Sequence, residues 1–587
     1  MAKPDRRNLK GPVKLSRLIA QVVSDLAGDL EEEVVSRSLT LLETAPLQEA
    51  CDYLKQKLDD AETFANIEIS QYAALRQVVG CFVKNADAPG STALLRKKTA
   101  FASFDASEKK CRLTNKRLAF YADHPSRRSD TVGEIFDRAR DIIHNIVGPL
   151  GRLQLQEIIE GSGFGPGFTF LNEEKDQKHL YFKCYGPHSV TKDALPYMKL
   201  WLNHSENWKQ SLIEHDCTYS VVEGNRLTTV PKDSSKDRTI AIEPSFNVYM
   251  QKGVDQFLKR RLLRHGVTLH NQERNHEPAR EGSLKPLHAA TVDLSSASDC
   301  VSIEAVRTLF PYDWFILLDD LRSKSYTLDK GKTWSQYEKF SSMGNAFTFP
   351  VESILFYAVA KACTVYAGGN QEVLRVYGDD IIVDPRAYCL LIEVLKFLGF
   401  SPNISKSFAF GPFRETCGAD FLHGIDVRPV YIKQVPKNDQ EVYNLFNRLL
   451  WNRFGFRTQR TLAFLYDCVR KPLIGPPHLP AGSKYWRWIA GKSVHHDHYF
   501  HAPKSSGERF ARTDPDWQCI VYEFDELRFK PKKVDSSSYV GQFLYLAFLL
   551  GVRKGDVDSY SRFRRILVRK TTSYWPDPPW RPYLYDL

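Results

Sequence analysis

Three patterns that mark common classes of protein are missing from this chain of 587 residues. Its 11 cysteines include no Cys-x-x-Cys pair, so we expect reduced thiols rather than a disulfide framework or a zinc ribbon. No uninterrupted apolar run approaches the roughly 20 residues that a membrane-spanning helix needs. Residues 1–17 are basic but contain no apolar stretch followed by a small-residue cleavage site, so we expect no secretory signal. A content of 43% hydrophobic residues indicates a globular protein, and the length favours two or three subdomains around a cleft.

The glycines of a nucleoside-triphosphatase phosphate loop are missing as well. Gly331-Lys332-Thr333 and Gly491-Lys492-Ser493 each lack the upstream glycine that such a loop requires, because Tyr326 and Trp486 stand there instead. The glycine-rich stretch 161–167 has a spacing that fits neither this loop nor the dinucleotide fingerprint, and we interpret it as a turn. The sequence therefore does not predict an ATPase.

Positive charge is concentrated in the last quarter of the chain. Residues 431–587 carry 26 Lys and Arg against 15 Asp and Glu, whereas the preceding residues carry 55 of each kind. The same segment holds six of the ten tryptophans and basic aromatic runs such as 484–488 and 562–565. Cations beside flat rings are typical of surfaces that bind phosphate backbones and stacked bases, so we expect a nucleic-acid partner. A helical domain with solvated charges would have the same composition.

Hydrophobic periodicity divides the chain into a helical part and a mixed part. Apolar residues recur at helical spacing over residues 14–60, and amphipathic helices continue to about residue 150. From about 286 to 430 strands and helices alternate, which indicates an α+β unit on an antiparallel sheet. We expect a strand that ends at Asp293, a helix over Gly344–Cys363, two strands joined by a tight turn across Val373–Val383, a helix over Tyr388–Leu398 and a strand over Ile404–Phe410.

Three aspartates are expected at the end of this sheet. A Gly-Asp dipeptide between two β-rich apolar runs predicts a hairpin with Asp379 and Asp380 at its tip. Asp293 ends another apolar strand, so strands that end side by side would gather all three carboxylates. Like charges at that distance repel one another, and oxygen-only ligation by aspartate suits Mg²⁺ or Mn²⁺. By itself, the Asp-Asp turn is equally typical of a solvated hairpin.

A short polar loop supplies the positive charge that a triphosphate requires. Residues 231–238 contain Lys232, Lys236 and Arg238 directly before the apolar strand Thr239–Ile242. Beside the carboxylates, these cations favour nucleotidyl transfer, in which two metal ions about 4 Å apart activate the attacking 3′-hydroxyl and stabilise the leaving pyrophosphate. Taken alone, the loop is equally typical of a surface turn.

In this order the motifs resemble those of the right-handed polymerases, and closely those of the replicase subunits of the small positive-strand RNA phages, the Qβ-like leviviruses. The resemblance runs from about residue 100 to 430. It lies in a phosphate-binding motif (Thr228–Pro244), a first catalytic motif (Thr291–Asp299), a template- and sugar-reading motif (Ser341–Asn345), the hairpin (Tyr377–Asp380), and two further matches, Cys111–Leu118 and Gly411–Gly418.

The resemblance implies a fold and an activity. The fold is α+β in the form of a right hand, with a helical region and the fingers, including the phosphate-binding loop, over residues 1–285. The palm with the catalytic carboxylates occupies residues 286–430, and a basic, aromatic-rich thumb and C-terminal region occupies 431–587. The activity is that of an RNA-dependent RNA polymerase, which replicates a viral RNA genome by adding NTPs to the 3′ end of a growing strand.

The resemblance also assigns roles to residues. Asp293 and Asp379 would ligate two Mg²⁺ or Mn²⁺ ions with the support of Asp380, while Asp299 and Asn345 would read the incoming ribose. Because a 2′-hydroxyl both donates and accepts, a carboxylate with an amide would reject a deoxynucleotide. The remaining nucleotide- and template-binding residues are Lys232, Lys236, Arg238, Ser342 and Gly344, and Lys406 is the candidate general acid for pyrophosphate.

Some of these assignments have alternatives. Lys236 stands one residue later than the middle lysine of the family's phosphate loop, so Lys232 and Arg238 match better. Lys406 is equally typical of a lysine that covers a sheet edge. Reverse transcriptases typically carry a bulky ring near the place of Asp299, and its absence here favours RNA synthesis. A reverse-transcriptase-like polymerase and a non-catalytic RNA-binding protein are the rival interpretations.

The expected partners are an RNA template and product and NTPs. The resemblance to the phage replicases further implies the host elongation factors Tu and Ts and a host ribosomal protein. The lack of a long apolar run leads us to expect no membrane, and the resemblance implies a location in the cytoplasm of an infected bacterial host.

Overall fold

The structure is a computed structural model that describes residues 9–472 with short gaps. The gaps are residues 62–66, 129, 166, 172–182, 184–186, 205–208, 210–218, 286, 341 and 451–457. Beyond residue 472 it describes the backbone of five strands: β13 (Ile474–Gly475), β14 (Phe500–His501), β15 (Ala511–Asp514), β16 (Cys519–Pro531) and β17 (Phe563–Tyr574). The basic aromatic run 484–488 lies outside the described residues.

The N-terminal part is helical, as the periodicity of residues 14–60 predicts. The buried side chains of α1 (Leu15–Asp25) follow a helical spacing that places them on one face, which packs against α2 and α4. They are Leu15, Leu18, Ile19, Val22 and Val23. The helices that follow are α2 (Glu32–Thr44), α3 (Leu47–Ala61) and α4 (Ile69–Gly80).

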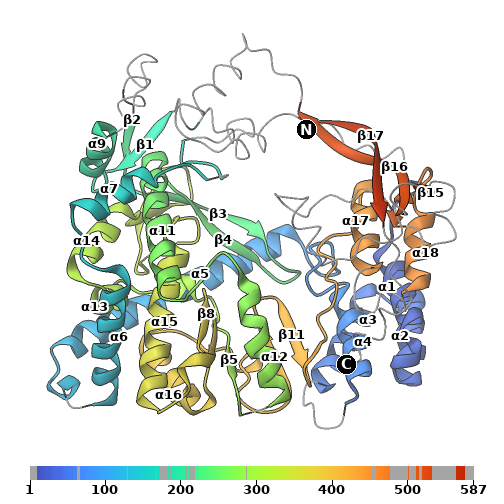
Figure 1. The fold of residues 1–587 in the computed structure, drawn as a ribbon, viewed down its shortest axis with the longest axis horizontal. Coiled ribbons are helices and arrows are strands. Elements are labelled where there is room, and N and C mark those ends of the chain that lie inside the picture. The colour runs from blue at the N-terminus through green and yellow to red at the C-terminus, as the bar shows by residue number, and fades with distance from the viewer. Residues whose placement is uncertain are drawn as a thin grey trace.

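The core of these helices includes residues from much later in the chain. Apolar side chains between residues 9 and 88 and between 413 and 469 form one buried cluster. Part of it comes from α17 (Asp439–Leu450) and α18 (Gln459–Asp467), which Figure 1 shows beside the N-terminal helices. The carboxylate of Asp25 also accepts the backbone N–H groups of Arg460 and Thr461 at the start of α18, at 2.8 Å each.

Helix α5 (Ala93–Ala122) runs from this cluster across to the other side of the molecule (Figure 1). There it packs against α13 and the strand β4, beside a second and larger hydrophobic cluster built around α15. The helices of that side are α6 (Thr131–Val147), α7 (Arg152–Glu160), α9 (Leu195–Asn203), α11 (Ser245–Arg264), α12 (His276–Leu284), α13 (Ile303–Leu309), α14 (Tyr312–Leu321), α15 (Thr348–Tyr366) and α16 (Pro385–Phe397).

Helix α15 is apolar on all sides because it lies inside this cluster. Its length and a mean hydropathy of 1.2 would suit a membrane span, but 83% of this apolar stretch is buried within the protein. It packs between α6 and α16 and against two strands. We therefore describe α15 as a core helix. It begins at Thr348 rather than at the expected Gly344, since the residues before it form turns.

A three-stranded antiparallel sheet lies against α15 in the order β5–β9–β8. Its strands are β5 (Ala290–Val292), β8 (Arg375–Tyr377) and β9 (Asp380–Val383). The structure thus confirms the expected hairpin and the expected strand before Asp293. The expected helix over Tyr388–Leu398 is α16, which begins three residues earlier, at Pro385, after the cap residue Asp384.

The strand expected over Ile404–Phe410 is wrong. Residues Ile404–Lys406 form a 3₁₀ turn, and the segment reaches the sheet only where the backbones of Phe408 and Thr291 bond to one another. The succession of strands and helices along this region predicted a strand here, but Asn403 instead bonds to Asp293 at the end of β5. One residue pair is thus all of the pairing that this segment makes with β5.

Three further sheets complete the described part of the fold before residue 472. The strands β4, β3, β6 and β7 form one sheet, β10, β11 and β12 a second, and β1 and β2 a parallel pair. Their bounds are β1 (His188–Thr191), β2 (Tyr219–Val222), β3 (Asn225–Pro231), β4 (Asp237–Ile242), β6 (Ser325–Thr327), β7 (Ser335–Gln336), β10 (Phe413–Thr416), β11 (Ala419–Leu422) and β12 (Ile425–Asp426).

Candidate active site

Two carboxylates lie at the tip of the β8–β9 hairpin. The pairing of Tyr377 with Asp380 closes a turn whose two central residues are Gly378 and Asp379. Gly378 has a φ of 61°, a conformation that favours glycine, and its N–H bonds to the Ser353 hydroxyl of α15 at 3.1 Å. The hairpin tip is therefore fixed from below by the core helix.

The third carboxylate, Asp293, follows the neighbouring strand. In the antiparallel register of β5 and β9, Val292 pairs with Ile381, so the next position on each strand is Asp293 and Asp380. The side chain of Asp293 accepts a hydrogen bond from the Asn403 amide at 3.2 Å, and its N–H donates to the Ser407 hydroxyl at 3.1 Å. The sheet thus brings the three aspartates to one edge, as the sequence predicts.

Burial raises the pKa of all three acids, and repulsion by neighbouring acids adds to the shift at Asp293 and Asp380. Burial, together with the charges of Asp379 and Glu415, raises the pKa of Asp293 to about 6, although Lys406 opposes the shift. The pKa of Asp380 rises to about 7 through burial and the charges of Asp379 and Asp293. Burial also raises the pKa of Asp379. The site therefore contains more negative charge than its own surroundings compensate.

This donor set suits a hard divalent cation, because it offers only oxygen ligands and its charges are uncompensated. As the side chains stand, however, no group of three or more His, Cys, Asp or Glu among the described residues is arranged to hold a metal ion. The carboxylate of Asp380 instead accepts the backbone N–H of Cys417 at 3.1 Å, and that of Asp293 is bonded to Asn403. The chemistry of these residues fits a divalent cation. To ligate it, the carboxylates of Asp380 and Asp293 would turn away from Cys417 and Asn403.

The expected cationic loop is the turn of the β3–β4 hairpin, and its charges act on the acidic edge. Lys232 follows β3, Lys236 lies in the turn and Arg238 is in β4. Burial and the neighbouring Lys236 and Arg238 lower the pKa of Lys232, and Asp379 opposes this shift. In turn, Lys232 and Arg238 lower the pKa of Asp379 against the effect of burial. The structure thus brings the three cations together, and Lys232 and Arg238 lie close enough to Asp379 to act on it.

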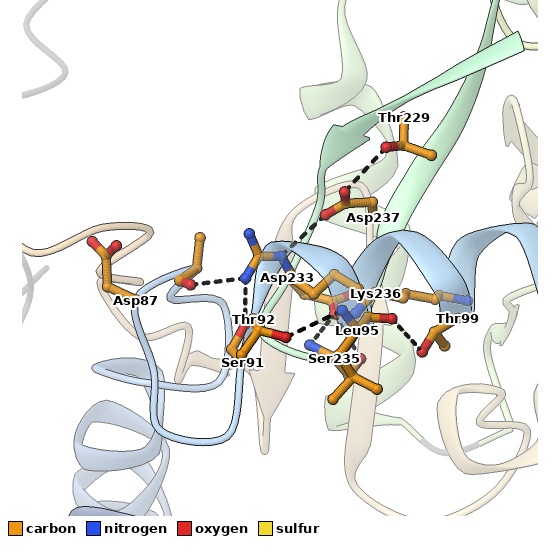
Figure 2. A network of polar contacts seen from close by, with 12 residues as sticks. Asp87, Ser91, Thr92, Leu95, Thr99, Thr229, Asp233, Ser235, Lys236 and Asp237 are labelled. Atoms are coloured by element: carbon orange, nitrogen blue, oxygen red, sulfur yellow. Dashed lines mark hydrogen bonds and ion pairs between the residues drawn. The ribbon is translucent and has the colours of Figure 1, made fainter.

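A buried arginine anchors this hairpin to α5. The guanidinium of Arg96, in the first turn of α5, bonds to Asp237 at 3.0 Å, to the Ala86 carbonyl at 3.0 Å and to the Ser91 hydroxyl at 2.6 Å. Figure 2 shows Asp237 beside Thr229, whose hydroxyl donates to it at 3.2 Å. Arg96 and Asp237 are both less than one tenth exposed. This network determines where the hairpin turn lies.

The turn itself is shaped by Asp233. Its carboxylate accepts the N–H groups of Ser235 and Lys236 and the Ser235 hydroxyl, as Figure 2 shows. Asp233 therefore determines the backbone course between the first two cations.

The candidate ribose-reading residues lie on segments that are joined to one another. Asp299 is in the 3₁₀ turn Ser298–Cys300, and its carboxylate bonds to the ammonium of Lys339 at 2.7 Å. Asn345 is buried, and its oxygen accepts the N–H of Phe347 at 3.0 Å. The amide nitrogen of Asn345 has no hydrogen-bond partner among the described residues. A buried donor without a partner is costly, which points to a ligand that accepts from it.

Gly344 is required by a close approach of two backbones. Its φ is 120°, and a Cβ at this position would lie 2.0 Å from the carbonyl oxygen of Ala241 in β4. The N–H of Ala241 in turn donates to the carbonyl of Met343 at 2.7 Å. Ser342 is buried beside it, whereas Ser341 lies outside the described residues. This contact joins the cationic hairpin to the loop before α15.

Lys406 faces the acidic edge. Although burial lowers it, the charges of Glu415 and Asp293 raise the pKa of Lys406 above its usual value. Its ammonium lies 3.6 Å from the Glu415 carboxylate. Lys406 is thus held near Asp293 by a 3₁₀ turn rather than by the strand that the sequence suggested.

A cavity of about 1260 Å³ is lined in part by both strands of the β3–β4 hairpin. Gly344 and Ala346 are in its wall, so it adjoins the loop before α15. Buried Asp255 pairs with two of its lysines, Lys252 at 2.5 Å and Lys259 at 2.7 Å. The cations that line the cavity are Lys97, Lys183, Arg226, Lys252, Lys259 and Lys330.

Several residues of the site do not follow from sequence patterns. The Cys417-Gly418 turn of the β10–β11 hairpin, with positive φ at both residues, supplies the N–H that bonds Asp380. Glu352 of α15 lies beneath the β8–β9 hairpin tip, where burial and then the charges of Asp379 and Asp299 raise its pKa well above the usual value. Cys417 and Gly418 lie within the Gly411–Gly418 match to the phage replicases, but that match assigns them no bond to Asp380. Nothing local marks Glu352.

These features describe an α+β protein with an acidic sheet edge that faces a cationic hairpin. A family model described as RNA replicase, beta-chain, matches residues 29–469, and the chain belongs to this family. The RNA-directed RNA polymerase subunit beta of Enterobacteria phage SP is 38% identical over 338 residues, or 57% of this chain and 56% of that protein. The subunit of Escherichia virus Qbeta is 37% identical over 352 residues, or 60% and 57%.

A third relative, the RNA-directed RNA polymerase beta chain of Escherichia phage MS2, is 40% identical over 249 residues, or 42% of this chain and 44% of that protein. The chain therefore aligns with about half the length of these relatives. Among solved structures, the BmCPV RNA-dependent RNA polymerase at elongation state superposes with a TM-score of 0.36 at 11% identity, over 58% of this chain and 34% of that chain. That likeness is too low to support an argument.

Proposed function

We propose that this chain is an RNA-dependent RNA polymerase, the catalytic subunit of a phage replicase. The observation that carries the proposal is the convergence of Asp293, Asp379 and Asp380 on one sheet edge, opposite the cationic hairpin. In this proposal the fold is a right hand, in which residues 1–285 include the fingers, 286–430 form the palm and 431–587 form the thumb. The family membership and the names of its relatives support it.

Each group has a task in the proposed reaction. Asp293 and Asp379, with Asp380 in support, would hold two Mg²⁺ or Mn²⁺ ions, which supply activation of the 3′-hydroxyl and charge stabilisation of the pyrophosphate. Lys232, Lys236 and Arg238 bind the triphosphate of the incoming NTP. The charges of Glu415 and Asp293 raise the pKa of Lys406 and so keep it protonated. Lys406 donates this proton to the leaving pyrophosphate.

The sugar is read by Asp299 and Asn345. A ribose 2′-hydroxyl can donate to the carboxylate of Asp299 and accept from the unpartnered amide nitrogen of Asn345. A deoxynucleotide would leave both groups without a partner, so the site selects NTPs. This feature argues against a reverse transcriptase.

The cavity lined in part by the cationic hairpin suits the RNA template. Its lysines and arginine are the charges that bind a phosphate backbone, and Ser342 and Gly344 bring the loop before α15 to its edge. In this proposal the template enters through the cavity and passes this loop to reach the incoming NTP.

The test is template-directed RNA synthesis by the full chain and by Asp379→Asn. We expect the variant to lose more than about 100-fold in Mg²⁺-dependent synthesis, because it removes a ligand charge, while it folds and binds RNA as before. Activity equal to the unmodified chain would refute the proposal and favour a non-catalytic RNA-binding protein. Preferred incorporation of deoxynucleotides would favour a reverse transcriptase instead.

The relatives come from phages, so we place the activity in an infected bacterial cell, in its cytoplasm. By resemblance to their family, the partners are the host elongation factors Tu and Ts and a host ribosomal protein. Purification of the tagged full chain from a bacterial host tests this assembly. Elution without any of these proteins at low salt would contradict it, and it would leave the polymerase proposal to the synthesis assay.

A further inference from the structure

Asp299, one of the two candidate sugar-reading residues, bonds to a buried lysine. The ammonium of Lys339 lies 2.7 Å from Oδ1 of Asp299. The Lys339 side chain is 1% exposed and that of Asp299 is 19% exposed. The lysine therefore lies on the buried side of the carboxylate, and part of the Asp299 side chain stays accessible.

Aromatic rings surround the lysine on the protein side. Its ammonium lies 4.4 Å from the ring centroid of buried Phe104 and 5.3 Å from that of Tyr337. The carboxylate of Glu108 on α5 accepts the N–H of the preceding residue, Glu338, at 2.6 Å. The charge of Lys339 also lowers the pKa of Glu108 against the effect of burial. The direction in which Lys339 points is thus determined by its surroundings.

The backbone of Asp299 is fixed as well, which leaves only its side chain to be oriented. Its N–H donates to the Ser296 carbonyl at 3.1 Å, and its carbonyl accepts from the Cys111 thiol at 3.4 Å. Without Lys339 the carboxylate could rotate about its side-chain torsions between several positions. With Lys339 bonded to Oδ1, the position of the other oxygen is determined.

Stability alone does not account for a fully buried lysine. Removing an ammonium from water costs several kcal/mol, and replacement of a buried ion pair by apolar residues is often neutral or stabilising. Lys339 is lined by Phe104 and Tyr337, where an apolar side chain would also pack. The ammonium also acts on the nearby carboxylate of Glu108, but its direct bond is to Asp299. A charge kept at this cost with that bond indicates a role in the orientation of the Asp299 carboxylate.

We propose that Lys339 is a positioning residue for sugar selection: it holds Oδ1 of Asp299 so that the other carboxylate oxygen meets the 2′-hydroxyl of an incoming ribonucleotide. The inference rests on the proposed polymerase function and extends it to a residue outside the motifs that the resemblance covers. Because an ammonium only donates, Asp299 is left as an acceptor, the role that a ribose hydroxyl requires.

The test compares kcat/KM for NTPs and for dNTPs in the full chain and in Lys339→Met. We expect kcat/KM for NTPs to fall about tenfold or more, since a charge-assisted hydrogen bond that orients Asp299 is lost. The value for dNTPs should change little, because these substrates do not use the bond. Lys396→Met is the matched control, as Lys396 forms an exposed pair with Glu393 on α16. It should leave both values unchanged.

A double-mutant cycle separates positioning from a general structural role. If Lys339 acts through Asp299, Asp299→Ala alone should lower the NTP to dNTP ratio, and adding Lys339→Met should lower it no further. Equal falls in NTP and dNTP efficiency in Lys339→Met, or additive effects in the double variant, would overturn the inference. If Lys339→Met does not fold, Lys339→Leu, which also lacks a donor, replaces it, and an unchanged ratio in that variant would overturn the inference equally.

The result for the unmodified chain shows which of the two proposals fails. If it makes no RNA, or incorporates dNTPs as well as NTPs, the proposed function fails. If it makes RNA with ribose selection and Lys339→Met keeps that selection, only the role of Lys339 fails.

Discussion

At the scale of single residues, the negative charges of the acidic edge (Asp293, Asp379 and Asp380) are unfavourable in the folded protein. Asp293 and Asp380 have their pKa raised to about 6 and about 7, with burial as the largest cause and neighbouring aspartates as the next. The folded protein therefore binds protons at these sites at a pH where the unfolded chain has released them. Without a cation, stability from these groups falls as the pH rises from about 4 to about 7.

Asp380→Asn tests this account of the acidic edge. With EDTA present at pH 8, we expect the variant to be more stable than the unmodified chain by about 2 kcal/mol, because it removes a buried repelling charge while an amide oxygen can still accept from Cys417. At pH 5 the difference should shrink, since Asp380 is then protonated. Urea unfolding at both pH values measures it, with the exposed Asp141→Asn of α6 as control. A variant that is less stable at pH 8 would contradict the account.

At the scale of elements, the β3–β4 hairpin is positioned by one contact beside its turn and another nearer its base. Arg96 joins Asp237 to the start of α5, and the backbone of β4 at Ala241 bonds to the loop before α15. These contacts hold the backbone to which the cations Lys232, Lys236 and Arg238 belong. Their position relative to Asp379 therefore depends on residues that touch no substrate.

Arg96→Met should show this dependence. Breaking a buried ion pair costs about 3 kcal/mol or more, because it leaves Asp237 buried and unpaired. In the proposed polymerase we also expect KM for NTPs to rise severalfold more than kcat falls, since the displaced cations bind the triphosphate. Thermal unfolding and steady-state kinetics measure the two effects. Arg138→Met, which breaks an exposed pair with Glu134, is the control. An unchanged KM in a destabilised Arg96→Met would show that the hairpin does not need this anchor.

The predictable part of the site is the part in which local sequence determines local structure. Gly378-Asp379 signals its own turn and Asp293 ends its own strand, so both could be placed from the sequence. Arg96, in contrast, reads as one of several cations in a helix, and its partner Asp237 is 141 residues away. The sequence around Lys339 likewise gives no sign that this lysine is buried. One of the rings beside it, Phe104, comes from α5, and the other, Tyr337, directly follows β7.

The one wrong element has the same origin. The order of strands and helices along this region predicted a strand over residues 404–410, but among the described residues their backbone bonds to β5 only at Phe408. The order of elements along a chain does not show whether a neighbouring strand is free to pair. Lys406 nevertheless reaches the acidic edge, since a 3₁₀ turn can present a side chain as well as a strand can.

At the scale of the whole molecule, two segments that are far apart in the sequence pack together. Residues 9–88 and 413–469 share a hydrophobic cluster, and a buried ion-pair network lies at its border. Asp420 of β11 is fully buried and pairs with Arg76 of α4 at 2.5 Å and with Arg428 at 2.7 Å. The N-terminal helices are therefore fastened directly to the β10–β11 hairpin whose turn bonds Asp380.

Arg76→Met should weaken this attachment and leave the chemistry of the site in place. We expect a loss of stability of about 3 kcal/mol, because buried Asp420 keeps only one of its two arginine partners. Asp420→Asn should cost a similar amount, and the double variant less than the sum, since the two residues act on one another. Chemical denaturation measures these values, with Lys396→Met as the exposed control.

The selection of NTPs over dNTPs by the folded Arg76→Met chain should remain, because Arg76 bonds to Asp420 and Tyr72 rather than to any sugar-reading residue. A fully additive double variant would show that Arg76 and Asp420 stabilise the protein separately. In that case the shared hydrophobic cluster, rather than the ion-pair network, would be what fastens the N-terminal helices to the hairpin beside the acidic edge.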